Sequence, residues 1–422
     1  MLDINRVRQD PEGIKKNLLR RPNPEYGAML DQLLKLDADW RRQKQELDEL
    51  RCKKNSISQE INSARKAGKD IKPFVKQAQE LPEQVKKTEA QVVQLEKDMH
   101  ELLLRIPNLL DSSVPDGKVD ESKVIKVFGK PAKPKFELKS HVDLAVEKGW
   151  VDMDRAAKIS GARWYFLKGQ LAILEMALSR YGVDFMTKKG HEVVVPPFMM
   201  SRAAYDGVVD LGAFDEALYK MENEDLYGIA TSEHPLTAQY MNEVFAADQL
   251  PLKLAGYSTN FRREAGAHGK DQKGIFRVHQ FNKVEQIMIC KPEDSWKHHE
   301  QLVKNAIDFW KTLKMPFRQV CLSTGDTGFV SAKTYDYEVW YPVQQAWREV
   351  GSCSNCLDYQ ARRLNMRFQQ GEERMFVHTL NATLIPTSRA IVAILENFQQ
   401  KDGTVKIPSV LHKYTGFKKL GK

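Results

Sequence analysis

Residues 260–285 read NFRREAGAHGKDQKGIFRVHQFNKVE and join a dense set of charged side chains to several glycines. The cations include Arg262, Arg263 and Arg277, and the acids include Glu264 and Glu285. A guanidinium offers a rigid fork of donors that matches phosphate oxygens, and glycines let the backbone bend closely around a nucleotide. The stretch therefore predicts a phosphate-binding site. A charged hairpin on the surface would have the same composition, so this stretch alone leaves both interpretations open.

Two flanking stretches add polar groups of the right kind. Downstream, HTLNATLIPTSRAIVAILEN (residues 378–397) places Arg389 at the start of an apolar helical run that ends near Glu396, where a guanidinium can clamp a phosphate. Upstream, TSEHPLTAQYMNE (residues 231–243) places Thr231 and Glu233 just after LYGIA, where a strand should end and a helix begin. A hydroxyl and a carboxylate there suit a small ammonium ligand. A helix cap for Thr231 and a surface charge for Arg389 remain alternatives.

Further upstream, two long runs of apolar residues follow an alternating three-four spacing. The first run has polar interruptions at Gln43 and Lys54 and comprises Leu33, Leu36, Trp40, Leu47, Leu50, Ile57, Ile61 and Ala64. The second run comprises Leu81, Val85, Thr88, Val92, Leu95, Met99, Leu102 and Ile106. This spacing is that of a heptad seam, and KAGKDIKP (residues 66–73) breaks both helices between the runs. We expect an antiparallel coiled-coil hairpin over about residues 30–106, with Pro82 in the first turn of its second helix.

Basic residues gather in the half of this hairpin nearest its turn. They are Arg51, Lys53, Lys54, Arg65, Lys66, Lys69, Lys72 and Lys76. Few acids oppose them, so a phosphate backbone could bind there. The pattern by itself equally permits a dimerising or spacer coiled coil, because Lys and Arg are common on solvated helix faces.

A change in composition predicts where the hairpin gives way to a second domain. Residues 108–123, NLLDSSVPDGKVDESK, are rich in Pro, Gly, Ser and Asp and show no helical period, so we expect a linker over residues 107–123. Beyond it, helix-like RWYFLKGQLAILEMALSRYGVDFMTKKG (residues 163–190) alternates with strand-like HEVVVPP, VEQIMIC and RMFVHTL. The expected fold class is therefore α+β, with an N-terminal helical region over residues 1–110 and a mixed domain over residues 124–422.

Composition sets the outer bounds. A chain of 422 residues exceeds one ordinary core, and a net charge of +9 favours a polyanionic partner without requiring one. No window approaches the roughly 18 consecutive apolar residues that a membrane span needs, so we expect no membrane association. The N-terminus fits neither a secretory nor a transit signal, and five scattered cysteines suit a reducing compartment. We expect a cytoplasmic protein.

Taken together, the FRxEAG segment, the TSE turn, REVGSCSN (residues 348–355) and the LNAT…SR helix resemble seryl-tRNA synthetases, members of the class II aminoacyl-tRNA synthetases. In this resemblance GHEVVVPP (residues 190–197) corresponds to motif 1, residues 261–285 to motif 2 and residues 381–396 to motif 3. Several separated motifs agree in order along nearly the whole chain. The resemblance implies a class II catalytic domain built on an antiparallel sheet with flanking helices, preceded by a tRNA-binding arm.

The resemblance implies a role for each motif residue. Arg262 and Arg389 would grip the ATP phosphates, with Glu264 and Phe281 at the adenine, and these two arginines and Glu264 would form the catalytic set. The implied ATP site comprises Arg262, Arg263, Glu264, Val278, His279, Gln280, Phe281, Glu349, Val350, Gly351, Ser352 and Arg389. Glu349 and Ser352 would hold Mg²⁺ or Mn²⁺, hard cations that prefer oxygen ligands.

The amino-acid and RNA sites are implied in the same way. The serine site would comprise Thr231, Ser232, Glu233, Arg262, Glu285, Asn381 and Thr383. The arm would contact tRNA through Arg51, Lys54, Arg65 and Lys69. Two positions depart from the common pattern of the family: Asn381–Pro386 replaces a glycine-serine-glycine run, and Gly351 stands where serine is frequent. These departures bear on the inner shape of the serine pocket.

The resemblance implies that serine attacks the α-phosphorus of ATP, pyrophosphate leaves, and tRNA(Ser) accepts the seryl group, as would tRNA(Sec) where present. It also implies a homodimer built through motif 1. Three other interpretations remain: a paralogue without charging activity, a ligase that charges carrier proteins, and a purely structural coiled coil. Serine-dependent exchange between ATP and pyrophosphate separates all three from the main interpretation.

Overall fold

The computed structural model describes residues 1–422 except 69, 132–133, 210–215, 265–273 and 422, and without the side chains of residues 72–76. Lys69 of the expected tRNA contact therefore lies outside the described residues. The chain divides into two compact units, one comprising Leu2–Pro107 and the other comprising Met1 and Asn108–Lys422. Each unit has its own core and is described by itself below.

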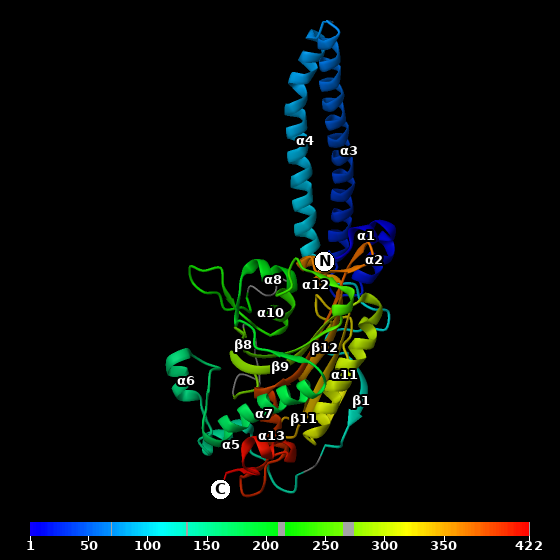
Figure 1. Cartoon of the computed structure of the whole chain (residues 1–422). Coiled ribbons are helices and arrows are strands. Elements are labelled where there is room, and N and C mark those ends of the chain that lie inside the picture. The colour runs from blue at the N-terminus through cyan, green and yellow to red at the C-terminus, as the bar shows by residue number, and fades with distance from the viewer. Residues whose placement is uncertain (69, 132–133, 210–215, 265–273, 422) are drawn as a thin grey trace. The chain divides into compact units, whose positions relative to one another are not determined.

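The first unit is the expected hairpin with two short helices in front. Its helices are α1 (Ile4–Gln9), α2 (Pro11–Leu18), α3 (Glu25–Lys66) and α4 (Lys72–Arg105). Helices α3 and α4 run antiparallel side by side (Figure 1). The seam buries residues that the heptad spacing selected, among them Leu33, Leu47, Ile57, Ala64, Leu81, Thr88, Val92, Met99 and Leu102. The hairpin and its register are confirmed.

One detail of the hairpin prediction is wrong. Pro82 does not lie in the first turn of the second helix, because α4 begins at Lys72 and contains Pro82 in its interior. Pro73 takes the position near the helix start instead. An interior proline removes one backbone hydrogen bond, and the apolar seam beside it, with Leu81 buried, compensates by packing.

A buried carboxylate fixes the base of the hairpin. Asp37 is fully buried on α3 and accepts hydrogen bonds from Nε of Arg8, at 3.1 and 3.0 Å, and from Nε of Arg41, at 3.1 Å. A buried charge needs such partners, since an unpaired one is strongly unfavourable. Arg8 lies at the end of α1, so this pair holds α1 against the long helix.

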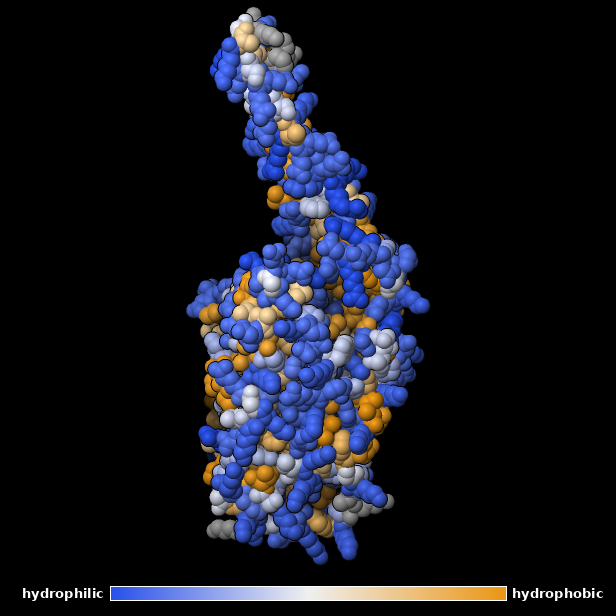
Figure 2. Space-filling model, turned by 45° about the vertical axis from the view of Figure 1, so that its right-hand side comes forward, coloured by the Kyte–Doolittle hydropathy of each residue, from blue (hydrophilic) through white to orange (hydrophobic). Residues whose placement is uncertain are grey.

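The outer surface of the hairpin is charged. Figure 2 shows it as mostly hydrophilic, with isolated apolar side chains. Lys54 and Arg65 are exposed, whereas Arg51 donates to Glu89 of α4 at 2.7 Å. Two of the predicted RNA contacts are therefore exposed cations, and the third already bridges the two helices.

The second unit is built on an eight-stranded sheet. In order across the sheet, its strands are β1 (Lys123–Phe128), β10 (Phe317–Cys321), β11 (Lys333–Tyr341), β12 (Ala346–Leu357), β15 (His378–Pro386), β9 (Gln280–Cys290), β8 (Leu252–Phe261) and β4 (Glu192–Val194). Every neighbouring pair is antiparallel except β4 with β8. The predicted antiparallel sheet with flanking helices and the α+β class are confirmed.

Helices that pack on the sheet include α7 (Gly169–Lys188), α11 (Ser295–Thr312) and α13 (Thr387–Asn397). Their apolar faces meet the central strands in one core that includes Leu178, Phe309, Trp310, Val284 and Ile391. Burying a large apolar side chain stabilises the fold by about 1.5–3 kcal/mol each. This core makes the central strands a rigid platform for the side chains at their ends.

Shorter elements complete the second unit. The helices are α5 (His141–Glu147), α6 (Met153–Ser160), α8 (Arg202–Val208), α10 (Glu233–Ala238), α12 (Tyr359–Leu364) and α14 (His412–Thr415), with 3₁₀ turns η1 (Ala247–Gln249), η3 (Pro292–Asp294) and η4 (Ser409–Leu411). The strands are β2 (Val151–Asp152), β3 (Phe166–Leu167), β5 (Met199–Met200), β6 (Tyr227–Gly228), β7 (Val244–Ala246), β13 (Arg367–Gln370), β14 (Glu373–Phe376), β16 (Val405–Lys406) and β17 (Lys419–Leu420). Across the described residues, no helix combines the length and apolar character that a membrane crossing requires.

Two segments differ from their expected form. The helix expected from residue 163 begins only at Gly169, because Phe166 and Leu167 pair with Val151 and Asp152 as a small sheet. The segment expected as a linker has no helix before β1, yet it is packed: Leu109, Leu110 and Val114 are buried. Asn108 also donates to the backbone carbonyls of Val330 and Cys356 at 3.0 and 2.8 Å. This segment therefore belongs to the second core.

The hairpin seam generates a stability prediction. Leu47 is 2% exposed. Replacing Leu47 with alanine should destabilise the hairpin by roughly 2–3 kcal/mol, because the shortened side chain leaves a gap in the seam. Hydrogen exchange on the full chain should then accelerate in peptides of α3 and α4 and stay unchanged in peptides of the large sheet. The exposed neighbour Glu46 is the matched control, and Glu46→Ala should shift exchange little. Equal acceleration in both units would contradict two independent cores.

Candidate active site

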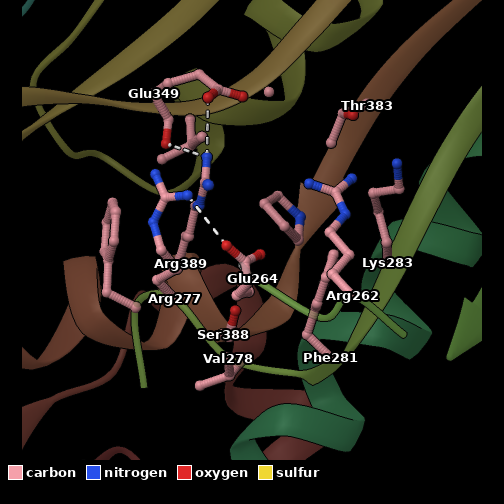
Figure 3. A pocket seen from close by; sticks show the side chains of 14 residues that line it. Arg262, Glu264, Arg277, Val278, Phe281, Lys283, Glu349, Thr383, Ser388 and Arg389 are labelled. Atoms are coloured by element: carbon pink, nitrogen blue, oxygen red, sulfur yellow. Dashed lines mark hydrogen bonds and ion pairs between the residues drawn. The ribbon is translucent and has the colours of Figure 1, made fainter. Parts of the chain in front are cut away.

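A polar pocket lies where β9, β12 and β15 meet the start of α13 (Figure 3). It encloses about 450 Å³ of space that opens to solvent. Its walls are formed by Arg262, Glu264, Phe276, Arg277, Val278, Phe281, Lys283, Glu349, Val350, Gly351, Thr383, Pro386, Ser388 and Arg389. Four cations and two carboxylates in so small a space make the pocket suited to a polyanion.

Arg262 is positioned by the pairing of β8 with β9. The residue directly follows β8, and its backbone N–H donates to the carbonyl of His279 at 2.9 Å. Its guanidinium lies 5.2 Å from the ring centre of Phe281, and its Nε donates to the carbonyl of Ala230 at 3.3 Å. Burial lowers the pKa of Arg262, and the positive charge of Arg389 lowers it further. An anion between the two arginines would relieve that repulsion.

Glu264 is held against the same pocket by two arginines. Arg277 donates to its carboxylate at 3.0 Å, and Arg163 donates to its backbone carbonyl at 2.8 Å. The backbone of Glu264 has φ of +49°, a conformation that non-glycine residues adopt rarely. In Figure 3 the Glu264 carboxylate lies between Arg262 and Arg389. A strained residue with a fixed carboxylate is typical of a ligand-binding position.

Arg389 enters from the first turn of α13 and meets Glu349 of β12. Its Nη1 donates to the Glu349 carbonyl at 2.9 Å and lies 3.1 Å from Oε2 of the same residue. Burial alone would lower the pKa of Arg389, but the Glu349 carboxylate raises it. Burial alone would raise the pKa of Glu349, but the charge and hydrogen bond of Arg389 lower it. Both groups therefore stay ionised at neutral pH.

A bulge in β12 sets the direction of Glu349 and Ser352. Across the β11–β12 ladder Glu349 pairs with Glu338 and Ser352 pairs with Asp336, and the register shifts between these two pairs. In a regular strand, residues three apart face opposite sides, whereas one extra residue restores the same side. Glu349 and Ser352 therefore share a face with Glu338 and Asp336. Burial raises the pKa of Asp336, and the nearby Glu349 raises it further.

A buried network beside the pocket centres on Glu285 of β9. Its carboxylate accepts from Lys283 at 2.7 Å, from Ser232 at 3.1 Å and from the hydroxyl of Thr231. Thr383 of β15 lies 3.4 Å from the same carboxylate. Burial alone would raise the pKa of Glu285, but Lys283 and the hydroxyl donors lower it. Glu285 is therefore an ionised carboxylate in a nearly water-free place.

Glu233 is held differently. Gln360 donates to its Oε1 at 3.0 Å, and Thr379 in turn donates to Gln360 at 2.6 Å. Burial raises the pKa of Glu233 to about 7, and the charge of Glu285 contributes to the rise. Glu233 thus lacks a cationic partner of its own among these hydrogen bonds, and a ligand ammonium would supply one.

The two positions that depart from the common family pattern, Gly351 and Thr383, are in direct contact across neighbouring strands. A Cβ added at Gly351 would lie 2.9 Å from Cβ of Thr383 on the neighbouring strand. That is closer than non-bonded carbon atoms approach each other. A larger residue at one position therefore requires glycine at the other, and the pocket keeps its volume.

The structure brings many of the predicted ATP-site residues together. Arg262, Glu264, Val278, Phe281, Glu349, Val350, Gly351 and Arg389 line the pocket. Arg263 lines a separate groove, and Gln280 lines a neighbouring hollow. The Nδ1 atom of His279 lies 2.7 Å from the Arg262 carbonyl. Ser352 is not on the pocket wall but follows the bulge described above.

The predicted serine-site residues are divided in the same way. Thr231, Ser232, Glu233 and Glu285 form the buried network, which Thr383 joins from the pocket wall. Asn381 instead points its amide at the sulfur of Cys356, at 3.7 Å. Among the described residues that line the pocket, Asn381 is absent.

The sequence interpretation missed several members of the site. Lys283, Phe276, Ser388 and Gln360 were assigned no role, yet three of them line the pocket and the fourth orients Glu233. Arg277 was counted among the cations of the phosphate-binding stretch but was not assigned to the ATP site, and it also lines the pocket. Lys283 could have been predicted from the sequence, because it lies two residues before Glu285 and so faces the same side of β9. Gln360 could not have been predicted in this way, because its contact with Glu233 spans 127 residues of chain.

Comparisons with known proteins agree with this geometry. Residues 1–110 match the seryl-tRNA synthetase N-terminal domain, and residues 218–398 match the tRNA synthetase class II core domain (G, H, P, S and T). The chain is 50% identical over 418 residues to a serine–tRNA ligase of Methanocella arvoryzae, covering 98% of each protein. It is 44% identical to the corresponding protein of Pyrococcus horikoshii, covering 100% of this chain and 97% of that protein.

Solved structures show the same likeness. The crystal structure of seryl-tRNA synthetase from Pyrococcus horikoshii complexed with ATP has a TM-score of 0.96 and 43% identity, covering 100% of this chain and 99% of that one. The cytoplasmic enzyme from Naegleria fowleri in complex with AMP has a TM-score of 0.90 and 33% identity, covering 100% and 98%. Family and fold agree over the full length, and this chain therefore belongs to the seryl-tRNA synthetase family, the serine–tRNA ligases of class II.

Proposed function

We propose that this chain joins serine to ATP as seryl-adenylate in the pocket described above and then passes the seryl group to the 3′ end of tRNA(Ser). The observation that carries the proposal is the pair of arginines, Arg262 and Arg389, which face one polar pocket beside the ionised carboxylate of Glu285. Two fixed cations suit the phosphates of ATP, and a buried carboxylate suits an ammonium.

For ATP, we assign the phosphates to Arg262 and Arg389 and the adenine end to Glu264 and Phe281. Each of these four side chains lines the pocket, and Arg277 fixes the Glu264 carboxylate at 3.0 Å. The serine carboxylate attacks the α-phosphorus and pyrophosphate leaves, so no enzyme nucleophile is needed. Catalysis of this kind depends on in-line positioning and on charge stabilisation at phosphorus, and preorganised arginines supply both.

The histidine next to the pocket is assigned to orientation. His279 stacks on Trp164 with ring centres 5.5 Å apart, and its Nδ1 is engaged by Tyr219 at 2.9 Å and by the Arg262 carbonyl at 2.7 Å. A ring held on one face and at one nitrogen stabilises the start of the loop that carries Arg262. It is poorly placed to move protons at the substrate.

For Mg²⁺ or Mn²⁺, we assign Glu349 and Ser352 as the protein ligands. The bulge places both side chains on one face of β12, and a carboxylate with a hydroxyl is a donor set that hard cations accept. Among the described residues no three His, Cys, Asp or Glu side chains converge on one point, so phosphate oxygens and water would complete the shell. When bound, the cation would neutralise phosphate charge.

For serine, we assign the ammonium to Glu233 and Glu285 and the hydroxyl to the side of Thr383. Thr231 and Ser232 donate to Glu285 and so fix its carboxylate. A site that hydrogen-bonds a hydroxyl rejects an analogue lacking it strongly, by roughly 10⁴-fold or more, whereas rejecting one extra methyl yields only about 10- to 200-fold. Alanine should therefore be excluded better than threonine.

We assign the polynucleotide contact to the hairpin, through exposed cations such as Lys54 and Arg65. Lys and Arg that neutralise backbone phosphates release counterions, which makes such binding salt-dependent. Arg51 would have to exchange its Glu89 partner for a phosphate. The same surface would serve tRNA(Sec) where a cell contains it.

We further propose a homodimer that works in the cytoplasm. Exposed apolar side chains lie on the edge strand β4, directly after it, and on the helix that packs against it: Val193 lies on β4, Val195 follows it, and Ile173 and Met176 lie on α7. Contiguous exposed apolar surface marks association. All five cysteines are free and four are buried, which suits a reducing compartment.

Removal of either arginine should abolish serine activation. Arg262→Ala and Arg389→Ala should each lower serine-dependent exchange between ATP and pyrophosphate by about 10²- to 10³-fold, the typical effect of removing one charge-stabilising donor. Arg155 of α6 is the matched control, since its side chain is 73% exposed and does not line the pocket. Near wild-type exchange in either arginine variant would refute its assigned role.

Serine affinity should depend on pH. Because the pKa of Glu233 is raised to about 7, the acid is neutral below that value and becomes a carboxylate as pH rises through it. The KM for serine should therefore fall by several-fold between pH 6 and pH 8, following one titrating group. Glu233→Gln keeps a hydrogen-bond acceptor for Gln360 and should bind serine weakly with no pH dependence over this range. A wild-type KM independent of pH would exclude Glu233 from the ammonium.

Charge reversal on the arm should separate the two steps. Lys54→Glu with Arg65→Glu should leave pyrophosphate exchange intact, weaken tRNA charging and reduce the slope of its salt dependence by roughly one for each phosphate that is no longer neutralised. Lys35→Glu with Arg42→Glu, nearer the base of the same helix, is the matched control. If the Lys54→Glu, Arg65→Glu variant charged tRNA at the wild-type rate and with the wild-type salt dependence, the hairpin would be a spacer and would not bind tRNA.

A further inference from the structure

Strand β1 has an open outer edge. It is the last strand of the eight-stranded sheet, at the edge opposite β4, and among the described strands only β10 pairs with it (Figure 1). Its residues are exposed except Phe128, which is partly buried. An edge strand of this kind presents backbone N–H and C=O groups to which a further strand can pair. The dimer contact proposed above uses the other edge of the sheet and leaves β1 accessible.

Apolar side chains on this strand are exposed. Val124, Ile125 and Val127 are 42%, 47% and 51% exposed. The register against β10 skips Ile125, and regular pairing resumes from Lys126 to Phe128. Single exposed apolar residues are normal on a protein surface. Three of them within four positions of an open strand edge are instead typical of a surface that associates with another chain.

Lysines surround the same strand. Lys126 of β1 and Lys311 of α11 lie over the ring of Phe128, with their Nζ atoms 5.5 and 5.1 Å from the ring centre. Exposed lysines also begin the strand and follow it, at Lys123 and Lys130. Glu121, the acid nearest the strand in sequence, accepts from the backbone N–H of Lys118 at 2.9 Å. The open edge therefore carries an excess of positive charge.

This charge decides among the candidate occupants of the edge. Two copies of β1 that paired with each other would bring their lysines together, and like charges on facing strands are destabilising. A single-stranded nucleic acid would need open ring faces. Phe128 instead stacks on Phe317, with ring centres 4.5 Å apart, and lies under two lysines. An extended acidic peptide would use the open backbone, the apolar side chains and the lysines together.

We propose that β1 docks an extended segment of another protein, in which acidic and apolar side chains alternate, as an added strand. Main-chain hydrogen bonds to the open edge would supply affinity, and the lysines would select the acidic sequence. The lysines thus serve two purposes, because they also exclude pairing between copies of this chain.

A labelled peptide tests the docking. It is about eight residues long, as a strand is, alternates glutamate with valine, and is titrated with the full chain while its fluorescence anisotropy is followed. The wild type should bind it about tenfold more tightly than a peptide with lysine in place of glutamate, because the lysines attract the first and repel the second. Proline in place of alternate valines should abolish binding, since proline cannot donate to a ladder. The bound glutamate peptide should also slow amide exchange in β1.

Charge reversal on the strand is the matching change in the protein. Lys123→Glu with Lys126→Glu should weaken binding of the glutamate peptide by about tenfold. This variant should retain serine-dependent pyrophosphate exchange, because no described residue of β1 lines the pocket. Lys158→Glu with Lys406→Glu makes the same change in net charge at exposed positions elsewhere and should bind the peptide as the wild type does.

The outcomes separate the occupants. Equal binding of the lysine or proline peptide, or equal weakening in the control variant, would overturn the proposal. Slower amide exchange in β1 that is caused by added tRNA, and not by the glutamate peptide, would overturn it in favour of a nucleic acid. Slower exchange that is caused by a rising concentration of the chain alone would overturn it in favour of a second copy.

Discussion

The organisation of the catalytic unit depends on the buried ion pair between Lys283 and Glu285. Both side chains lie on β9 in the middle of the sheet and are at most 6% exposed. Desolvating two charges is unfavourable unless every remaining lone pair and proton finds a partner. The partners come from the turn before α10, which supplies Thr231 and Ser232, and from β15, which supplies Thr383. Satisfying one ion pair therefore fixes three separate segments of the chain relative to one another.

That constraint gives the pocket its electrostatic character. Lys283 balances the charge of Glu285, and Arg277 balances that of Glu264. The remaining cations of the pocket wall are Arg262 and Arg389, and each is oriented by a fixed neighbour, Phe281 or Glu349. Burial is the main cause of the lowered pKa of Arg262, and repulsion by Arg389 lowers it further before a ligand arrives. A bound polyphosphate converts this repulsion into attraction. A few preorganised charged side chains therefore make the pocket prefer an anionic substrate.

Features with a local cause were predictable from sequence. The hairpin follows from a three-four spacing that any helix pair obeys, and Arg389 follows from the start of an apolar helix. Features that depend on long-range pairing were not. Arg262 and Arg263 are neighbours in sequence, yet strand geometry sends them to different cavities. The bulge that aligns Glu349 with Ser352 is visible only in the register against β11, and the start of α4 depended on packing that lets Pro82 remain inside the helix.

The repeating seam of the hairpin makes its length adjustable only in steps. Seven residues added to both α3 and α4 would return every seam position to the interface and extend the pair by about 10 Å, whereas a number that is not a multiple of seven would shift the seam around each helix. Asp37 and its arginines anchor the base, so added length would appear only toward the turn. The length of the arm can therefore change by insertion or deletion of whole heptads in both helices. Such a change requires no adjustment of the catalytic core.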